Sequence, residues 1–239
     1  MTRPSSRIAT IAAVAMVLAG CEGTLQPGLQ GSGRQASEQR DVAAFERIDV
    51  VGQTTVTVAS GEPSVTVRGD DNLLAHVVTR VEDGTLLIDE RRSVDPRTEL
   101  VVEVTTPQLS GASLQGSGDL TVRDVAGETF TAVLDGSGDL EVAGLTGEAF
   151  TAELGGSGSL RASGQVQQVD LSLSGSGSAE LQGLAALRAT VDVDGSGDAL
   201  VSVSETLDAS SSGSGDVIYT GDPQNVQEDV SGSGDIRPR

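Results

Sequence analysis

Five aspartates hold the same place in a repeated motif, directly after Gly-Ser-Gly: Asp119, Asp139, Asp198, Asp216 and Asp235. Ser159 and Ser178 hold that place in the other two copies. If the copies stack, these side chains form a column, and carboxylate oxygens are ligands that Ca²⁺ prefers. Asp and Ser also favour tight turns, because their side chains bond to nearby backbone N–H groups. We therefore predict a turn-forming role without a metal or other cofactor, with a Ca²⁺ ladder on the five aspartates as the alternative.

The only cysteine, Cys21, follows Ala19 and Gly20 at the end of an apolar run over 8–18, and Arg3 and Arg7 precede that run. The run is shorter than the roughly 20 residues that span a bilayer, so 1–20 is predicted to be a secretory signal. Small residues before a lone cysteine resemble the bacterial lipoprotein signal, in which the cysteine is acylated and becomes the mature N-terminus. Acyl chains on Cys21 would anchor the protein in a membrane. Ordinary cleavage beside an incidental cysteine is the alternative.

The composition argues against several classes of function. The chain has 239 residues, with Lys+Arg 15 against Asp+Glu 35, so its net charge of −20 disfavours nucleic acid as a partner. It has no Trp, one Tyr and three Phe, which leaves few side chains for stacking on bases or sugars. One histidine, His76, cannot build a histidine metal cluster, and we predict a structural or exposed role for it. No catalytic residue is predicted.

The elements that must position the aspartates follow from a repeat. Gly-Ser-Gly recurs at intervals of 18 to 20 residues, starting at Gly116, Gly136, Gly156, Gly175, Gly195, Gly213 and Gly232. Apolar residues flank each copy at every second position, which is the period of a strand with one buried face. A 20-residue repeat of strands without a helix predicts an all-β fold, a parallel β-helix (solenoid) with about 20 residues per coil.

The repeated glycines fall on the same parity as the buried side chains. Glycine in a strand costs about 0.5–1 kcal/mol relative to alanine, so the fold must need it there. We predict a corner at which the coil bends and the interior narrows.

The chain is predicted to have three parts: the signal at 1–20, a flexible tether at 21–40 and one β-helix domain at 41–239. Within that domain, 111–239 holds the seven coils, and 41–110 is an irregular section that covers the first edge. The stretch around Gly52 aligns with the one around Gly136, and 72–81 is predicted to be a short helix or an irregular strand.

Several motifs together resemble one bacterial family. They are the spaced residues Arg40-Asp41-Val42, Phe45 and Ile48-Asp49-Val50, then Gly69-Asp70, Asn72-Leu73-Leu74, Asp83-Gly84 and the Gly-Ser-Gly-Asp repeats. They resemble the family called putative auto-transporter adhesin, head GIN domain. The resemblance implies a right-handed, single-stranded β-helix in a cell-envelope protein, often a lipoprotein, without a catalytic motif. Gly31-Ser32-Gly33 resembles the opening of that family, so the ordered domain could begin before Arg40.

These features predict a non-catalytic, lipid-anchored protein of the bacterial cell envelope that acts as an adhesin or surface scaffold. Glu22 after the cysteine, where Asp is associated with inner-membrane retention, favours the outer membrane. The partner would be an unidentified protein or polysaccharide. One alternative is a periplasm-facing structural or stress-response lipoprotein with a protein partner. A weaker one is a polysaccharide-acting β-helix enzyme, for which paired carboxylates would supply acid–base groups.

Overall fold

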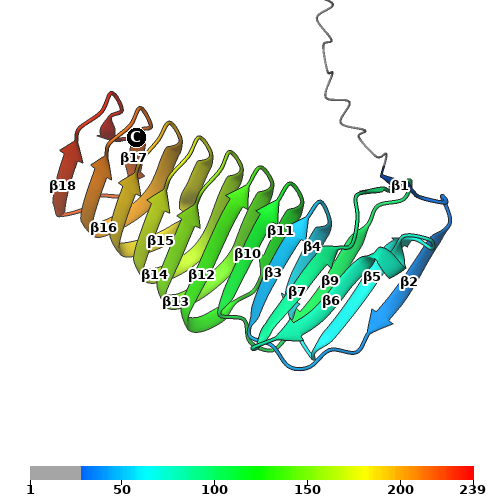
Figure 1. Ribbon diagram of the computed structural model, residues 1–239. Helices are drawn as coiled ribbons and strands as arrows, with labels where there is room; N and C mark the ends of the chain where they lie inside the picture. The colour runs from blue at the N-terminus through cyan, green and yellow to red at the C-terminus, as the bar shows by residue number, and fades with distance from the viewer. Residues whose placement is uncertain (1–27) are drawn as a thin grey trace, which may run out of the picture.

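The structure, a computed structural model, describes residues 28–239. Stacked parallel strands form a β-solenoid in which the tight turns line up along one edge of a rod (Figure 1). The coils from the first Gly-Ser-Gly turn onward contain the strands β10 (Gly111–Gly116), β11 (Asp119–Arg123), β12 (Ala126–Gly136), β13 (Asp139–Leu154), β14 (Ser159–Leu173), β15 (Ser178–Val193), β16 (Asp198–Ser211), β17 (Val217–Thr220), β18 (Asn225–Val230) and β19 (Ile236–Pro238). The predicted solenoid with about 20 residues per coil is confirmed.

The strand register places equivalent residues of successive repeats side by side. Leu114 pairs with Leu134, and Leu134 pairs in turn with Leu154. The same holds after the turn, where Asp119 pairs with Asp139. Columns of like side chains therefore run along the rod, as the alternating pattern predicted.

Apolar columns fill the interior of the coils. Leu134, Leu140 and Phe150 are fully buried, and the rings of Phe130 and Phe150 stack with their centroids 6.4 Å apart. Burying each such side chain stabilises the fold by about 1.5–3 kcal/mol. Because successive coils supply equivalent side chains, each coil completes the packing of its neighbour.

The section before the first Gly-Ser-Gly turn continues the same coil, although its chain order differs. Its strands are β1 (Leu29–Gln30), β2 (Gln35–Arg40), β3 (Arg47–Gly52), β4 (Thr55–Ser60), β5 (Ser64–Asp70), β6 (Val77–Glu82), β7 (Thr85–Glu90), β8 (Val94–Asp95) and β9 (Val101–Thr106). Strands β3 and β4 pair in parallel with β10 and β11, and Gly52 lies opposite Gly116, as the alignment predicted. Strands β7 and β9 pair with β3 and β4 on the side away from β10 and β11, and so form the last coil at this end of the rod. The order of the coils along the rod therefore differs from their order in the sequence, because β3 and β4 come first in the chain.

Antiparallel strands close this end of the rod. β5 pairs antiparallel with β9, β2 with β5, and β6 with β7. The stretch predicted as a helix or strand, 72–81, contains a 3₁₀ turn at Leu74–His76 and the start of β6. Because β5 pairs antiparallel with β9, the N–H and C=O groups on the outer edge of β9 are not free to pair with a further parallel coil.

The boundary between tether and domain differs from the prediction. Residues 21–40 were predicted to be a flexible tether, yet β1 and β2 lie within that range, and the ordered domain begins by Leu29 rather than at residue 41. Strand β2 has the polar sequence QASEQR, so backbone pairing with β5 holds it rather than an apolar face. The resemblance of Gly31-Ser32-Gly33 to the family's opening had indicated this earlier start.

Candidate functional site

The Gly-Ser-Gly turns share one hydrogen-bonding scheme along the edge of the rod. The carbonyl oxygen of Gly136 accepts two bonds from the next turn, from the N–H of Ser157 at 2.9 Å and of Gly158 at 3.1 Å. The carbonyls of the equivalent glycines, from Gly52 to Gly213, do the same for their next turns. This carbonyl ladder satisfies the backbone donors of each turn without any side chain.

The ladder also explains the glycines, for a reason other than the one predicted. A Cβ on Gly156 would overlap the carbonyl oxygen of Gly136 in the preceding coil, and a Cβ on Gly158 would overlap that of Gly138. The first glycine is therefore excluded by the coil beside it along the rod axis, and the prediction that a narrowing interior excludes its side chain is wrong. Only the second glycine meets the core as well, since its Cβ would also lie 3.0 Å from a methyl group of Leu134.

The five predicted aspartates form the expected column, but parts of it are engaged in the fold. Asp198 Oδ1 accepts the N–H of Asp216 at 3.0 Å, and Asp216 Oδ1 accepts that of Asp235 at 3.0 Å. Arg161 lies 3.8 Å from Asp139, and Arg237 lies 3.4 Å from Asp216. The backbone bonds that these aspartates accept come from the turn of the next coil, 18 and 19 residues further on, and not from their own turn.

The side chains that the structure describes do not assemble a metal centre. Within residues 28–239, no three His, Cys, Asp or Glu side chains come together as metal ligands would. Asp119 lies opposite Asp139, but Ser159 and Ser178 separate this pair from Asp198. The Ca²⁺ ladder thus gains no support from the arrangement of the aspartates.

At the closed end of the rod, two turns have no preceding coil whose glycine carbonyl could accept their N–H groups, and a carboxylate accepts them instead. Glu90 Oε1 accepts the N–H of Gln53 at 3.1 Å and the hydroxyl of Thr54 at 2.6 Å. Gln53 and Thr54 occupy the Ser and second Gly positions of the turn that begins at Gly52. Because a side chain rather than a coil lies beside this turn, it accommodates Thr54 where later turns need glycine.

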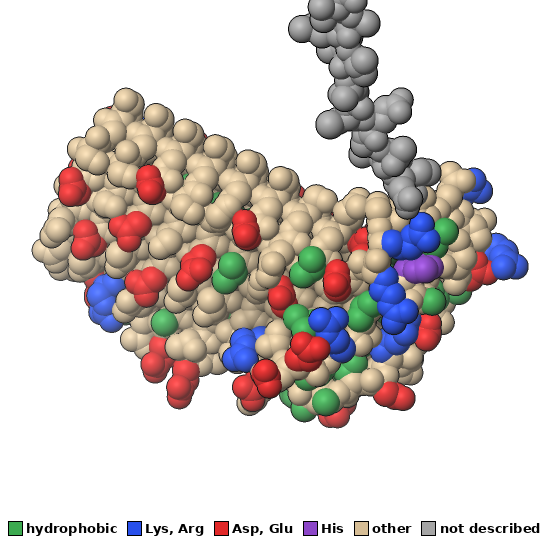
Figure 2. All heavy atoms as spheres, in the orientation of Figure 1, with side chains coloured by type: hydrophobic (Ala, Val, Ile, Leu, Met, Phe, Trp, Pro, Cys, Tyr) green, Lys and Arg blue, Asp and Glu red, His purple; other side chains and the backbone are tan. Residues whose placement is uncertain are grey.

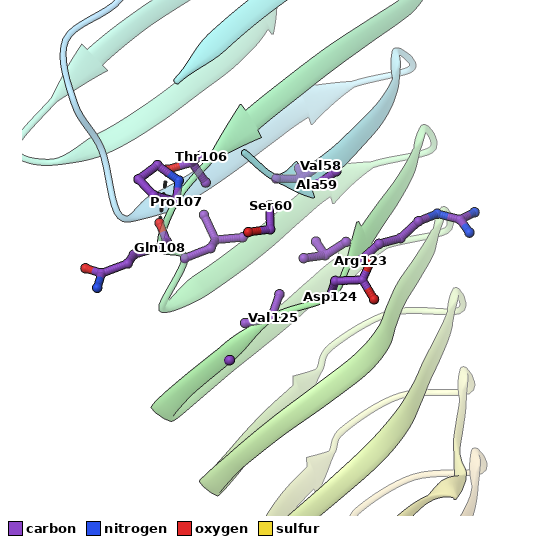
Figure 3. Close-up of a pocket in the computed structure, with 12 residues that line it drawn as sticks. Val58, Ala59, Ser60, Thr106, Pro107, Gln108, Arg123, Asp124 and Val125 are labelled. Atoms are coloured by element: carbon purple, nitrogen blue, oxygen red, sulfur yellow. Dashed lines mark hydrogen bonds between the residues drawn. The ribbon is translucent and has the colours of Figure 1, made fainter. Parts of the chain in front are cut away.

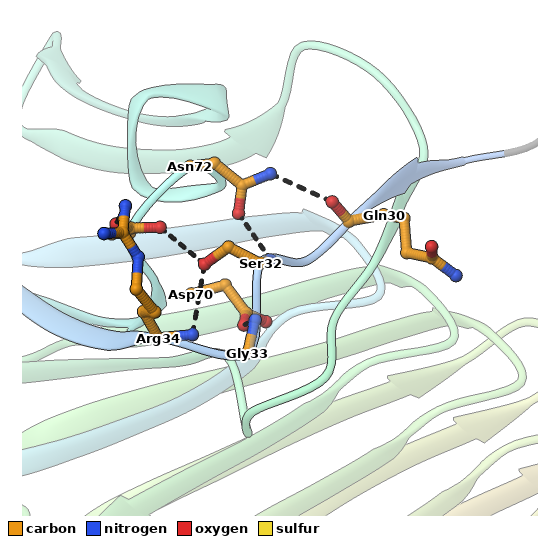
Figure 4. A network of polar contacts seen from close by, with 7 residues as sticks. Gln30, Ser32, Gly33, Arg34, Asp70 and Asn72 are labelled. Carbon is orange, nitrogen blue, oxygen red and sulfur yellow. Dashed lines mark hydrogen bonds and ion pairs between the residues drawn. The ribbon is translucent and has the colours of Figure 1, made fainter.

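Asp70 is the carboxylate acceptor for the Gly31-Ser32-Gly33 turn (Figure 4). Its carboxylate is fully buried and accepts backbone N–H groups of Gly33 at 2.6 Å, Arg97 at 2.8 Å and Thr98 at 3.0 Å. Burial opposes ionisation of Asp70, but the N–H donors of Thr98, Arg97 and Gly33 outweigh it and lower the pKa of the carboxyl. The contacts of Asp70 and Glu90 could not be predicted from the sequence, because the tertiary fold sets their partners; the one signal was the place of Asp70 in the family motif.

The residues around Asp70 extend this network. Ser32 donates its hydroxyl to Asp71 and its N–H to Asn72, and Asn72 donates in turn to the carbonyl of Gln30 (Figure 4). The Ser32 hydroxyl, with help from the nearby Arg34, lowers the pKa of Asp71. The network ties the first ordered turn to the end of β5, so these groups are structural.

The hollows of the surface lie mainly where the closed end meets the regular coils. One of about 70 Å³ is lined by residues from the ends of β4, β9 and β11, including Ser60, Thr106 and Asp124 (Figure 3). A second, of about 460 Å³, lies beside Phe45, Pro63 and Pro107. Neither lining contains His76. Thr106 donates its hydroxyl to the backbone carbonyls of Phe45 and Gln108, and among the described residues no hydrogen bond joins Ser60 or Thr106 to Asp124, as an activated nucleophile would need.

The comparisons with known proteins bear on this geometry. A family model named putative auto-transporter adhesin, head GIN domain, matches residues 44–223. The chain belongs to this family. The family resemblance seen in the sequence is confirmed, and the family's name points to adhesion at the envelope or surface rather than to catalysis.

Several solved structures are similar to this chain. A putative adhesin from Bacteroides fragilis is 24% identical with a TM-score of 0.83, and the match covers 89% of this chain and 100% of that one. A putative adhesin from Parabacteroides distasonis is 26% identical with a TM-score of 0.67, with the same coverage. A putative lipid binding protein from that organism is 22% identical with a TM-score of 0.74, again covering 89% and 100%. These likenesses show a shared fold, and none of the curated proteins matches the chain.

Two of the sequence predictions, the signal at 1–20 and the lipidation of Cys21, lie outside the described residues. Within the described residues, no helix is long and apolar enough to cross a membrane.

Proposed function

We propose that this protein is a non-catalytic, lipid-anchored component of the cell envelope that serves as an adhesin or surface scaffold. The observation that carries the proposal is the in-register stacking of the coils, which sets the outward side chains of successive coils in rows along the rod while apolar columns fill the inside. A row of equivalent groups about 4.8 Å apart suits an extended partner, because many weak contacts add along its length.

The net charge of the rod favours some classes of partner over others. Residues 111–239 carry five arginines against twenty acidic residues, a net charge of −15. Such a surface repels acidic polymers and attracts basic ones. We therefore favour a protein with basic groups or an uncharged polysaccharide as the partner of the rod.

The name of one relative, the putative lipid binding protein from Parabacteroides distasonis, suggests a lipid as a second kind of ligand. In this chain the coil interior is occupied by side chains such as Leu134, Phe150 and Leu171, all buried. An acyl chain inside the rod would have to displace them. We therefore assign lipid only to the anchor and not to the coils.

The anchor is tested by metabolic labelling. Cells that express the full chain and are fed radiolabelled palmitate should label it, and the Cys21→Ser variant should carry no label. Labelling of the variant, or absence of label on the wild type, would exclude Cys21 as the site.

The side of the membrane is tested by protease treatment of intact cells. A surface adhesin should be digested, whereas the periplasm-facing alternative should survive until the outer membrane is opened. An enzyme would be revealed differently, by turnover on a panel of uronic-acid polymers that the protein alone produces.

A further inference from the structure

Three arginines lie on the segment that passes the start of the described chain. Arg91, Arg92 and Arg97 belong to 91–97, which leads from β7 through β8. β8 pairs with β1, and Leu29 donates its N–H to the carbonyl of Ser93 at 2.9 Å. These arginines therefore surround the place where the domain connects to the residues before it.

The three side chains are exposed and free of carboxylate partners within the described part of the chain. None of them takes part in an ion pair there, whereas Arg34 pairs with Asp71 and Arg68 with Glu103. Within the described residues the side chain of Arg97 donates only to the amide oxygen of Gln30, at 3.1 Å. The buried Asp70 nearby is already committed to three backbone N–H groups.

The segment itself has the opposite charge to the rod. The segment 91–97 contains three arginines and one acid, the exposed Asp95, for a net charge of +2. The rod over 111–239 carries −15. Figure 2 shows arginines gathered around the single histidine at the closed end, whereas acidic side chains predominate along the rod. His76 lies beside them, since its carbonyl accepts the N–H of Arg91 at 3.0 Å.

The proposed anchor holds this surface close to a membrane. Six residues, 22–27, separate Cys21 from Gly28, which makes seven Cα–Cα steps. Fully extended, they span at most about 25 Å. An acylated Cys21 would therefore keep the arginines within reach of the headgroup layer.

We propose that Arg91, Arg92 and Arg97 rest on anionic lipid headgroups and hold the rod away from the membrane. Guanidinium groups form paired hydrogen bonds with phosphate oxygens, and a cluster of arginines is attracted by an anionic surface. Repulsion between the acidic rod and the same lipids favours the same orientation. The inference rests on the proposed lipid anchor.

The test replaces the biological anchor with a synthetic one. The chain from Cys21 onward retains every described residue and has one thiol and no tryptophan. Cys21 is coupled to a maleimide lipid in phosphatidylcholine vesicles with or without phosphatidylglycerol. Ser93→Trp, beside the arginines, supplies the only tryptophan, and lipids with a nitroxide on the headgroup quench its fluorescence at short range.

Quenching should be stronger on anionic than on neutral vesicles and should weaken as salt is added. Replacing all three arginines by glutamine should lower the ratio of docked to undocked protein by roughly a hundredfold. The control variant Arg123→Gln/Arg188→Gln/Arg239→Gln removes the same charge elsewhere and should leave quenching unchanged. A tryptophan at Leu187, which is exposed on the rod, should stay unquenched.

Two outcomes would overturn the inference. One is equal quenching on neutral and anionic vesicles, which would leave the arginines free for another acidic partner. The other is an equal loss in both triple variants, which would show an effect of net charge and not of this surface. Because the synthetic tether does not depend on acylation, failure of the palmitate experiment would contradict the anchor alone.

Discussion

One carbonyl oxygen both binds and constrains the next Gly-Ser-Gly turn. The oxygen of Gly136 accepts the N–H groups of Ser157 and Gly158, and it stands where a Cβ of Gly156 would be. Positive φ is not the common reason, since among the seven first glycines only Gly116 and Gly195 have φ in the left-handed range, at 139° and 155°. Close stacking of the coils therefore accounts for the repeated glycines.

Gly156→Ala should therefore destabilise the protein, because the new methyl group meets backbone that cannot rotate away. We expect a loss of about 1–3 kcal/mol, typical of overpacking. For a chain of this size, Tm should fall by about 2–4 °C for each kcal/mol, measured by circular dichroism. Gly127→Ala is the control, since its nearest new neighbour would be 4.0 Å away. Equal stability of the two variants would contradict the stacking argument.

Asp70 should give the fold a dependence on acid. Its pKa is lowered in the folded state, so its ionised form stabilises the fold above the ordinary carboxyl pKa. That contribution is lost as the pH falls below about 4 and approaches the lowered pKa. Asp70→Asn should lower Tm at neutral pH and reduce the further fall of Tm in acid. The exposed Asp95→Asn should melt like the wild type across the same series.

Removing Ca²⁺ should leave the aspartate column stable. Asp198 and Asp216 already accept backbone N–H groups of the following turns, so their oxygens do not need a cation to be satisfied. We expect the same Tm in EDTA and in added Ca²⁺. A Tm that EDTA lowers and excess Ca²⁺ restores would revive the calcium ladder.

Among the elements, the turn at Gly52 depends on β7. Glu90, at the end of that strand, supplies the hydrogen-bond acceptor that a preceding coil supplies to the later turns. Glu90→Ala leaves the N–H of Gln53 and the buried hydroxyl of Thr54 without this acceptor. Leaving the buried Thr54 hydroxyl without an acceptor should cost about 1–3 kcal/mol. Hydrogen exchange should accelerate at Gln53 and stay slow at Ser137, whose acceptor is the Gly116 carbonyl. Glu82→Ala, which removes only an exposed partner of Arg80, should alter neither amide.

The regular elements could be predicted from sequence because each coil repeats the same alternation of apolar residues around a Gly-Ser-Gly turn. The alternation around Leu134 and Leu140 predicted which face is buried, and the likeness of Gly52 to Gly136 predicted an earlier coil. The position of β7 and β9 beyond β3 could not be predicted, since every alternating strand satisfies the same local pattern and only pairing decides the order. Glu90 and Asp70 were missed for the same reason.

The described molecule is an acidic rod with one basic segment, 91–97, at its closed end. Six intervals between the Gly-Ser-Gly turns give this part a length of about 30 Å at 4.8 Å per coil. The acidic groups of 111–239 are distributed along it, and Arg91, Arg92 and Arg97, which have no ion-pair partner among residues 28–239, lie at the closed end. Such a polarity would orient the protein on any charged surface to which its closed end is tied.

This charge distribution makes the fold sensitive to salt in an unusual direction. Residues 28–239 carry thirteen arginines against thirty-four acidic residues, a net charge of −21, so repulsion exceeds the attraction within the surface ion pairs. Adding NaCl from about 0.01 M to about 0.15 M shortens the screening length from about 30 Å to about 8 Å and should raise Tm. The rise should level off once screening is complete, whereas a general effect of solute on hydration would continue with concentration. A Tm that falls with added salt would mean that attractive ion pairs, such as Arg161 with Glu180, outweigh the repulsion along the rod.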